Sequence, residues 1–280
     1  MKEAVLRDLI RWQLVNGVAG FYICGSTGEG VIMPPSARRV MAEVTVDEVQ
    51  GEGKIIDHIG AVDLLTAIEL AQHAANAGVD ALSSVPPLFF KYSEGEIYQY
   101  YKTLASVVDL PFIIYTFGMD LATVERLMAI PNIIGLKYTN PNYYEMHRFK
   151  KLSGGDINVF NGSDESLLCG LVMGADGGIG STYNVMPKLF VSLYQEFQTG
   201  NIVKAQQLQF KINKVIEVII EFGVFPGVKE LLIMMGFPVG YCTLPLKRFT
   251  DDERRQFKKR IEHVLASDDS SNSLREQLNQ

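Results

Sequence analysis

Two side chains with reactive groups stand at the ends of short apolar runs. Lys137 closes the run from 133 to 137, and Tyr115 closes the run from 111 to 115. A lysine that is partly removed from water supplies a neutral amine, which attacks a carbonyl carbon and forms a Schiff base. A tyrosine that faces the same cavity relays a proton. For either residue alone, the ordinary interpretation is a lysine that reaches solvent or a tyrosine packed in the core.

A segment rich in glycine and hydroxyl groups, GSTGEG (25–30), follows another apolar run. Successive backbone N–H groups in such a turn, with the hydroxyls of Ser26 and Thr27 beside them, form a cradle for a carboxylate or a phosphate. An ordinary turn between a strand and a helix is the alternative interpretation.

A third polar segment, NGSDE (161–165), contains Asp164 and Glu165, whose carboxylates could accept hydrogen bonds from sugar hydroxyls. Ser163 or Asp164 would equally suit the N-cap of a following helix. Ser181 follows a short glycine-rich run and belongs to the same set of run ends.

The elements that must position these residues follow from an alternation of short β-rich runs with longer amphipathic runs, which indicates strands and helices around a parallel sheet. The predicted strands are 21–24, 55–59, 81–85, 112–115, 133–137, 159–161 and 178–180. The predicted helices are 2–14, 62–77, 94–107, 143–152, 187–198, a long helix from 202, 228–235 and 251–264.

A closed (β/α)8 barrel is favoured over an open sheet, because the sequence contains neither a P-loop nor a complete dinucleotide fingerprint. The active site of such a barrel lies at the C-terminal ends of its strands, where the polar residues above are expected. Because the chain opens directly in a helix, the barrel lacks an evident first strand, and extra helices follow the last one. We expect a barrel domain over 1–200, a C-terminal helical extension packed on it over 201–266, and a polar tail over 267–280.

Composition excludes several partner classes. The 26 basic and 32 acidic residues give a net charge of −6, which argues against nucleic acid or an anionic membrane as a partner. With 47% hydrophobic and 21% charged residues, the chain is expected to be globular. No apolar stretch suits a membrane helix or a signal peptide, so a cytoplasmic protein is expected. Three scattered cysteines and four scattered histidines predict no metal site.

Five motifs in order resemble the N-acetylneuraminate lyase and dihydrodipicolinate synthase family of class I aldolases: GSTGEG (25–30), IIY (113–115), GLKYT (135–139), FNGSDE (160–165) and GADGGIGSTYN (174–184). The resemblance runs from about Leu6 to about Val264. It is nearer to the lyases than to the synthases, which carry an arginine shortly after the tyrosine. The stretch 116–120 contains none.

The resemblance implies a (β/α)8 barrel with extra C-terminal helices that assembles as a homotetramer. It also implies cleavage of N-acetylneuraminate to pyruvate and N-acetylmannosamine without a metal or organic cofactor. Lys137 would then be the Schiff-base lysine and Tyr115 the proton shuttle, while Ser26 and Thr27 would bind the pyruvate carboxylate. The residues implied at the sugar end are Thr139, Gly162, Asp164, Glu165 and Ser181.

Three differences from the family pattern are visible. The opening strand is missing ahead of Lys2, the loop after Tyr115 is short, and Phe89 stands where the family has a tyrosine of the proton relay. Two alternatives therefore stay open beside the lyase: a non-catalytic homologue that binds a keto acid, and an aldolase for another 2-keto-3-deoxy sugar acid or a dihydrodipicolinate-type substrate.

Overall fold

The computed structural model describes residues 2–116 and 118–266. The chain divides into two units. The sheet unit consists of Ala19–Ser163 and Cys169–Ile179, and the helical unit consists of Met1–Val18, Asp164–Leu168 and Gly180–Gln280. The polar tail predicted over 267–280 lies outside the described residues, and the boundary predicted at 200 stays a prediction.

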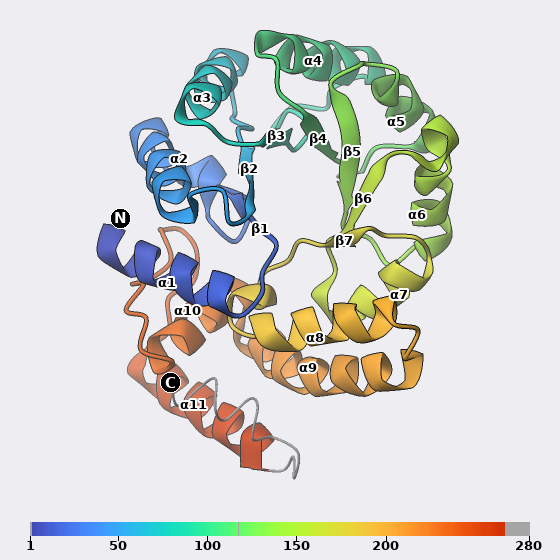
Figure 1. The fold of residues 1–280 in the computed structure, drawn as a ribbon. Helices are drawn as coiled ribbons and strands as arrows, with labels where there is room; N and C mark the ends of the chain where they lie inside the picture. The colour runs from blue at the N-terminus through green and yellow to red at the C-terminus, as the bar shows by residue number, and fades with distance from the viewer. Residues whose placement is uncertain (1, 117, 267–280) are drawn as a thin grey trace. The chain divides into compact units, whose positions relative to one another are not determined.

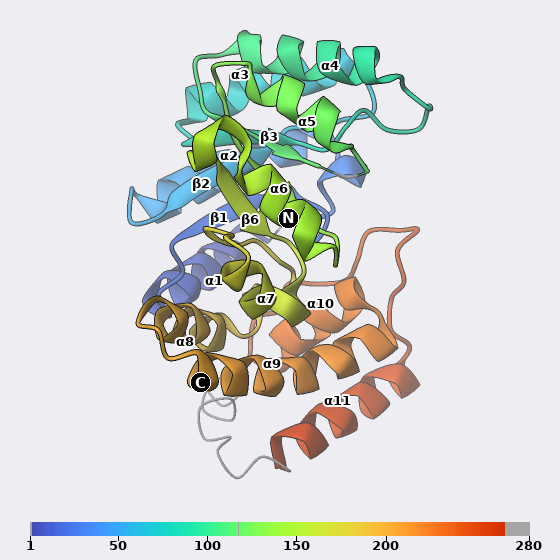
Figure 2. The same ribbon diagram turned by 90° about the vertical axis from the view of Figure 1, so that its right-hand side faces the viewer.

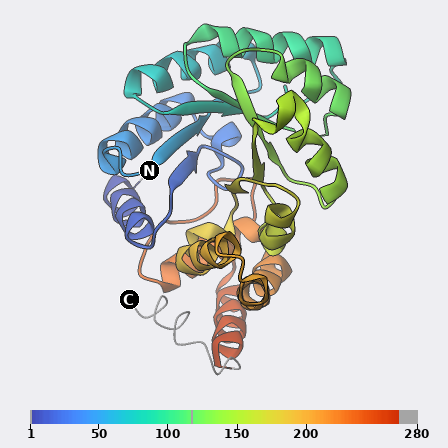
Figure 3. The same cartoon turned by 45° about the vertical axis from the view of Figure 1, so that its right-hand side comes forward.

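The sheet unit contains seven parallel strands, each hydrogen-bonded to the next along the chain. They form a curled sheet, whose strands all point the same way (Figures 1 and 3). The strands are β1 (Gly20–Ile23), β2 (Lys54–His58), β3 (Ala81–Ser84), β4 (Phe112–Tyr115), β5 (Ile133–Tyr138), β6 (Asn158–Asn161) and β7 (Gly177–Gly178). All seven predicted strands are confirmed, with small differences at their ends.

Five helices of the sheet unit run along the outside of the curled sheet (Figure 1). They cover the outer face of the strands, which explains why β3 and β4 are buried at every position and read as continuous apolar or small-residue runs. These helices are α2 (Pro35–Val49), α3 (Leu64–Ala77), α4 (Glu94–Val107), α5 (Leu121–Met128) and α6 (Tyr143–Lys150). The 3₁₀ turns η1 (Gly30–Ile32) and η2 (Leu152–Gly155) belong to the same unit, and the residues of α7 (Leu167–Val172) are divided between the two units.

Local signals fix the ends of these helices. Asp63 accepts a hydrogen bond from the backbone of Thr66 at the start of α3, and Gly78 ends that helix with φ of 94°, a conformation that glycine adopts without strain. Ser93 and Glu96 form a capping box at the start of α4. Helices α2 and α5 were not predicted from the sequence.

The helical unit contains α1 (Glu3–Val15), η3 (Asp164–Ser166), η4 (Thr182–Asn184), α8 (Pro187–Gln198), α9 (Ile202–Phe222), α10 (Val224–Met234) and α11 (Asp251–Ala266). In Figure 2, α8 lies beside α9, and α11 lies below α9. The rings of Phe222, Phe249 and Phe257 pack against one another with centroids 5.4 to 5.9 Å apart. This aromatic cluster joins the end of α9 to α11.

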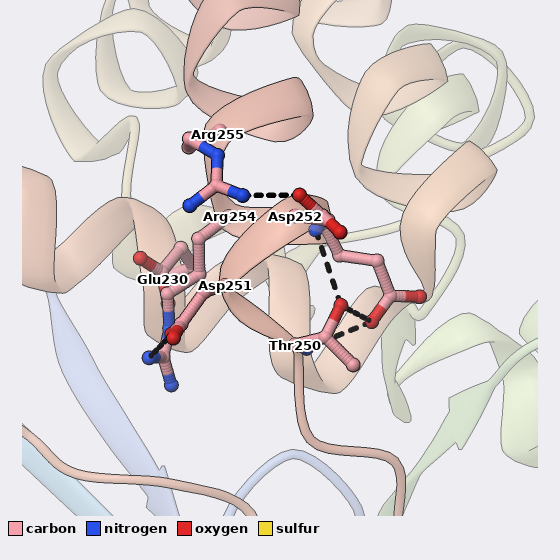
Figure 4. A network of polar contacts seen from close by, with 7 residues as sticks. Glu230, Thr250, Asp251, Asp252, Arg254 and Arg255 are labelled. Atoms are coloured by element: carbon pink, nitrogen blue, oxygen red, sulfur yellow. Dashed lines mark hydrogen bonds and ion pairs between the residues drawn. The ribbon is translucent and has the colours of Figure 1, made fainter.

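The first turn of α11 is held by polar contacts (Figure 4). The backbone N–H and the hydroxyl of Thr250 donate to the Glu253 carboxylate, and the Glu253 backbone donates back to the Thr250 hydroxyl. Arg254 donates to Glu230 on α10 at 3.2 Å and to Asp251 at 3.1 Å. The reciprocal hydrogen bonds of Thr250 and Glu253 form a capping box that fixes the start of α11, and the contact of Arg254 with Glu230 fixes the position of α11 on α10.

The α/β class and the parallel sheet are confirmed, as are helices after the last strand. Among the described residues the strands number seven and the first element is α1, whereas the loss of a first barrel strand stays a prediction. No helix in the described ranges is long and apolar enough to cross a bilayer.

Candidate active site

Lys137 and Tyr115 lie side by side in the sheet unit. Tyr115 is the last residue of β4 and pairs in register with Lys137 on β5, so both side chains project from the same face of the sheet. Each is only 7% exposed. The Lys137 Nζ atom lies 4.3 Å from the centroid of the Tyr115 ring. The predicted nucleophile and the predicted proton shuttle are thus brought together in a site largely closed to water.

A second tyrosine faces the same amine from β1. The Lys137 Nζ atom lies 5.3 Å from the centroid of the Tyr22 ring. The Tyr22 hydroxyl lies 2.8 Å from the Ser83 Oγ atom on β3, and the Ser83 hydroxyl donates to the Ile113 carbonyl on β4 at 2.6 Å. Because a hydroxyl has one hydrogen, the Tyr22 hydroxyl is the donor to Ser83. Burial raises the pKa of Tyr22 well above its ordinary value.

Tyr22 was not predicted as a site residue, because it does not stand at the end of an apolar run. The available signal was the period of two along a strand. Tyr22 lies inside β1, one residue before its end, and Lys137 likewise lies one residue before the end of β5.

The turn after β1 folds back on itself. The Gly30 N–H donates to the Gly25 carbonyl at 3.1 Å, and a Cβ atom on Gly30 would lie 1.8 Å from the Cys24 carbonyl oxygen. Only glycine fits at position 30. Ser26 is exposed and Thr27 half-buried, in the same unit as Lys137. The cradle predicted for these two residues stays a prediction.

Thr139 and Gly162 are brought together after β5 and β6. The Gly162 N–H donates to the Tyr138 carbonyl at 2.7 Å. A Cβ atom on Gly162 would lie 1.9 Å from the Thr139 Oγ1 atom, so the threonine side chain occupies the space that the glycine leaves free.

The three other predicted sugar-binding residues belong to the helical unit. Asp164 is 7% exposed, and its Oδ2 atom accepts hydrogen bonds from both the backbone N–H and the hydroxyl of Thr182, each at 2.7 Å. Ser181 precedes Thr182 and is half-buried, whereas Glu165 is exposed. Asp164 is the first residue of η3, and its carboxylate ties that turn to the start of η4.

A buried group of polar side chains lies on β2 and α2 and directly after β1. Arg38 donates to the carbonyls of His58 and of Gly60, the latter at 2.9 Å. Burial raises the pKa of Asp57 to about 7, although the charge of Arg38 and a hydrogen bond from the Cys24 thiol act in the opposite direction. Asp57 and His58 stand in an apolar run, and the sequence does not indicate whether such residues are buried or exposed, so this group was not predicted.

His58 connects this group to the lysine. Its Nε2 atom accepts a hydrogen bond from the Val85 backbone at 3.1 Å, which places the proton of the neutral ring on Nδ1. Burial, together with the positive charges of Arg38 and Lys137, lowers the pKa of His58 to about 3. The imidazole is therefore neutral at physiological pH.

Phe89 occupies the position at which the resemblance places a tyrosine. It is 87% exposed and has φ of 82°, and its ring meets that of Phe90 edge to face at 4.9 Å.

Tyr92, three residues after Phe89, lines a cavity of about 500 Å³ together with Pro87 and Tyr100. The lining of this cavity includes neither Lys137 nor Tyr115.

Two bacterial N-acetylneuraminate lyases resemble this chain along most of its length. An N-acetylneuraminate lyase of Rhizobium meliloti is 36% identical over 263 residues, which cover 92% of this chain and 88% of the relative. An N-acetylneuraminate lyase of Clostridium perfringens is 34% identical, with 90% of each chain covered.

Solved structures agree with these relatives. The structure of CdNal from Clostridium difficile in complex with mannosamine matches with a TM-score of 0.89 and 34% identity, covering 94% of this chain and 93% of that chain. Dihydrodipicolinate synthase from Aquifex aeolicus matches with a TM-score of 0.88 and 25% identity, over 94% and 92% of the two chains. The model of the dihydrodipicolinate synthetase family matches residues 1–264. The chain therefore belongs to the dihydrodipicolinate synthetase family, which agrees with the expectation from its motifs.

Proposed function

We propose that the protein is a class I aldolase that cleaves N-acetylneuraminate to pyruvate and N-acetylmannosamine through a Schiff base on Lys137. The observation that carries the proposal is the buried pair of Lys137 and Tyr115, with Nζ 4.3 Å from the ring centroid. The lyases of Rhizobium meliloti and Clostridium perfringens support the choice of substrate.

The chemistry follows from the neutral amine of Lys137. The amine adds to the keto carbon of the sugar acid, and loss of water leaves a protonated imine. When the bond between the α and β carbons breaks, its electron pair forms the C=C bond of an enamine between the α carbon and the former imine carbon, while the hydroxyl on the departing β carbon loses its proton and becomes an aldehyde. The enamine then takes a proton on carbon, and hydrolysis releases pyruvate and the free lysine. The Tyr115 hydroxyl is assigned the proton transfers.

The remaining roles in the sheet unit are assigned by chemistry and by resemblance. Ser26 and Thr27 bind the carboxylate of the keto acid, and Thr139 with Gly162 lines the sugar end. The sugar-binding roles of Asp164, Glu165 and Ser181 rest on the resemblance alone, and the homotetramer and the cytoplasmic location likewise stay predictions.

Trapping with pyruvate and borohydride tests the Schiff base. We expect a reduced adduct on the peptide that contains Lys137 and none in the Lys137→Arg variant, which keeps the charge but cannot form an imine. Lys150 is the internal control, because its amine donates to Asp176 and to the Ile157 carbonyl. An unmodified Lys137 after treatment would contradict the proposal.

A coupled assay for pyruvate tests the substrate. Release from N-acetylneuraminate supports the lyase. Release only from another 2-keto-3-deoxy sugar acid would keep the aldolase and overturn the substrate, and an adduct without release from any of them would support a keto acid-binding homologue.

A further inference from the structure

The inner face of the sheet holds one residue whose contacts reach both parts of the proposed reaction site. We propose that Tyr22 is a positioning residue that holds the amine of Lys137 and the Gly25–Gly30 turn in fixed relation to each other. This inference deepens the proposed function and rests on it, because it assigns the residue that sets where the amine and the predicted carboxylate cradle stand.

The ring of Tyr22 is the first contact. With the Lys137 Nζ atom 5.3 Å from the Tyr22 centroid and 4.3 Å from the Tyr115 centroid, the amine faces two aromatic rings. Aromatic faces attract an ammonium group, most strongly where water is excluded. Lys137 as a whole is only 7% exposed, so the two rings replace part of the hydration of its amine.

The edge of the same ring is the second contact. A Cβ atom on Gly25 would lie 2.7 and 2.9 Å from the Cε1 and Cδ1 atoms of Tyr22. The backbone of the turn therefore passes directly against the ring, and any side chain at position 25 would push the two apart. The position of the turn that carries Ser26 and Thr27 is thus set by Tyr22.

The hydroxyl of Tyr22 is the third contact and fixes the ring itself. It donates to Ser83 on β3, which donates to the Ile113 carbonyl on β4. Ile113 lies two residues before Tyr115 on the same strand. One side chain on β1 is thereby anchored across two further strands, and its ring has little freedom to move.

The titratable groups around the amine come from three strands. Tyr22 on β1 and Tyr115 on β4 face it with their rings, and His58 on β2 is near enough for the charge of Lys137 to lower its pKa. Asp57 and Arg38 act on Tyr22 and His58 in turn. A change confined to the Tyr22 ring leaves all of these other groups in place.

Competitive acetylation with acetic anhydride measures the Lys137 amine without any keto acid. In Tyr22→Leu we expect Lys137 to be acetylated several-fold faster at a fixed pH, because the amine loses one of the two rings that pack on it. Tyr22→Phe keeps the ring and is expected to stay nearer to the wild-type rate. Phe149→Leu, which removes a fully buried ring on α6, is the control for a general loss of packing.

Steady-state kinetics measures the effect on the turn. We expect Tyr22→Leu to raise KM for the keto acid several-fold more than it lowers kcat, because the turn loses its support while Lys137 and Tyr115 remain. A rate of Lys137 acetylation in Tyr22→Leu that matches the wild type, or an equal change of that rate in Phe149→Leu, would overturn the inference. A wild-type protein that acetylates normally but forms no pyruvate adduct would instead overturn the proposed function.

Discussion

One oxygen atom of Asp164 accepts both hydrogen bonds that Thr182 can donate, at 2.7 Å each. The two residues are 18 positions apart, and the buried carboxylate holds η3 to the start of η4. A buried N–H that loses its acceptor keeps its desolvation cost and gains nothing in return.

Asp164→Ala is therefore expected to lower the free energy of unfolding by about 2 to 3 kcal/mol, measured by urea denaturation. Glu165→Ala is the matched control, because Glu165 is the next residue in the chain and its side chain is exposed. This substitution is expected to change the free energy of unfolding by no more than about 0.5 kcal/mol. Equal effects of the two substitutions would contradict a structural role for the Asp164 carboxylate.

Tyr115→Phe separates binding from proton transfer. The ring beside Lys137 is retained, so we expect the borohydride adduct with pyruvate to form as in the wild type. The hydroxyl that moves the proton is lost, and turnover is expected to fall by roughly 10² to 10⁴. Borohydride trapping measures adduct formation, and a stopped assay of pyruvate release measures turnover. Wild-type turnover in this variant would exclude Tyr115 as the shuttle.

Gly162→Ala tests the close contact with Thr139. The new methyl group would lie 1.9 Å from the Thr139 Oγ1 atom, and we expect a loss of about 1 to 3 kcal/mol of stability. Adding Thr139→Ala removes that oxygen, so part of the loss should be recovered. Recovery is expected to be incomplete, because the Cβ atom of residue 139 stands 3.0 Å from the added methyl. Additive losses in the double variant would argue against the contact.

Asp57 is expected to make the fold less stable as the pH rises. Burial raises its pKa in the folded protein to about 7 from an ordinary value of 3.8. The folded state therefore holds the proton more tightly, and this contribution to stability is present below about pH 4 and lost as the pH rises through about 7.

Thermal midpoints of the wild type and Asp57→Asn between pH 4 and pH 8 measure this contribution. The variant cannot ionise at position 57, so its stability relative to the wild type should increase with pH across that window. Asp109→Asn, at an exposed position, is the control and should run parallel to the wild type. A constant difference between Asp57→Asn and the wild type would show that Asp57 does not titrate in this range.

The sequence predicts the strands well because their apolar runs are short and bounded. Lys137 and Tyr115 were predicted to share a site because both come at the ends of neighbouring runs, and the register confirms that they pair. Helix α2 was missed because its buried face includes Arg38 and Thr45 while Val40 is exposed, so no apolar periodicity marks it.

Long-range polar contacts could not be predicted in the same way. Nothing near Asp164 in sequence indicates that Thr182 satisfies its carboxylate, and nothing in the run around Tyr22 indicates a hydrogen bond to Ser83. Such contacts depend on how elements far apart in sequence meet, which periodicity does not encode.

The close packing of the Gly25–Gly30 turn has a consequence for how substrate preference could change. Gly25 is pressed against the Tyr22 ring and Gly30 against the Cys24 carbonyl, whereas Ser26 and Gly28 are exposed. A side chain at either terminal glycine would clash, and a Cβ atom on Gly28 would lie only 3.3 Å from the Cys24 backbone nitrogen, whereas position 26 is exposed. A library at position 26 alone would change the side chain offered to the keto acid without losing the backbone that presents it.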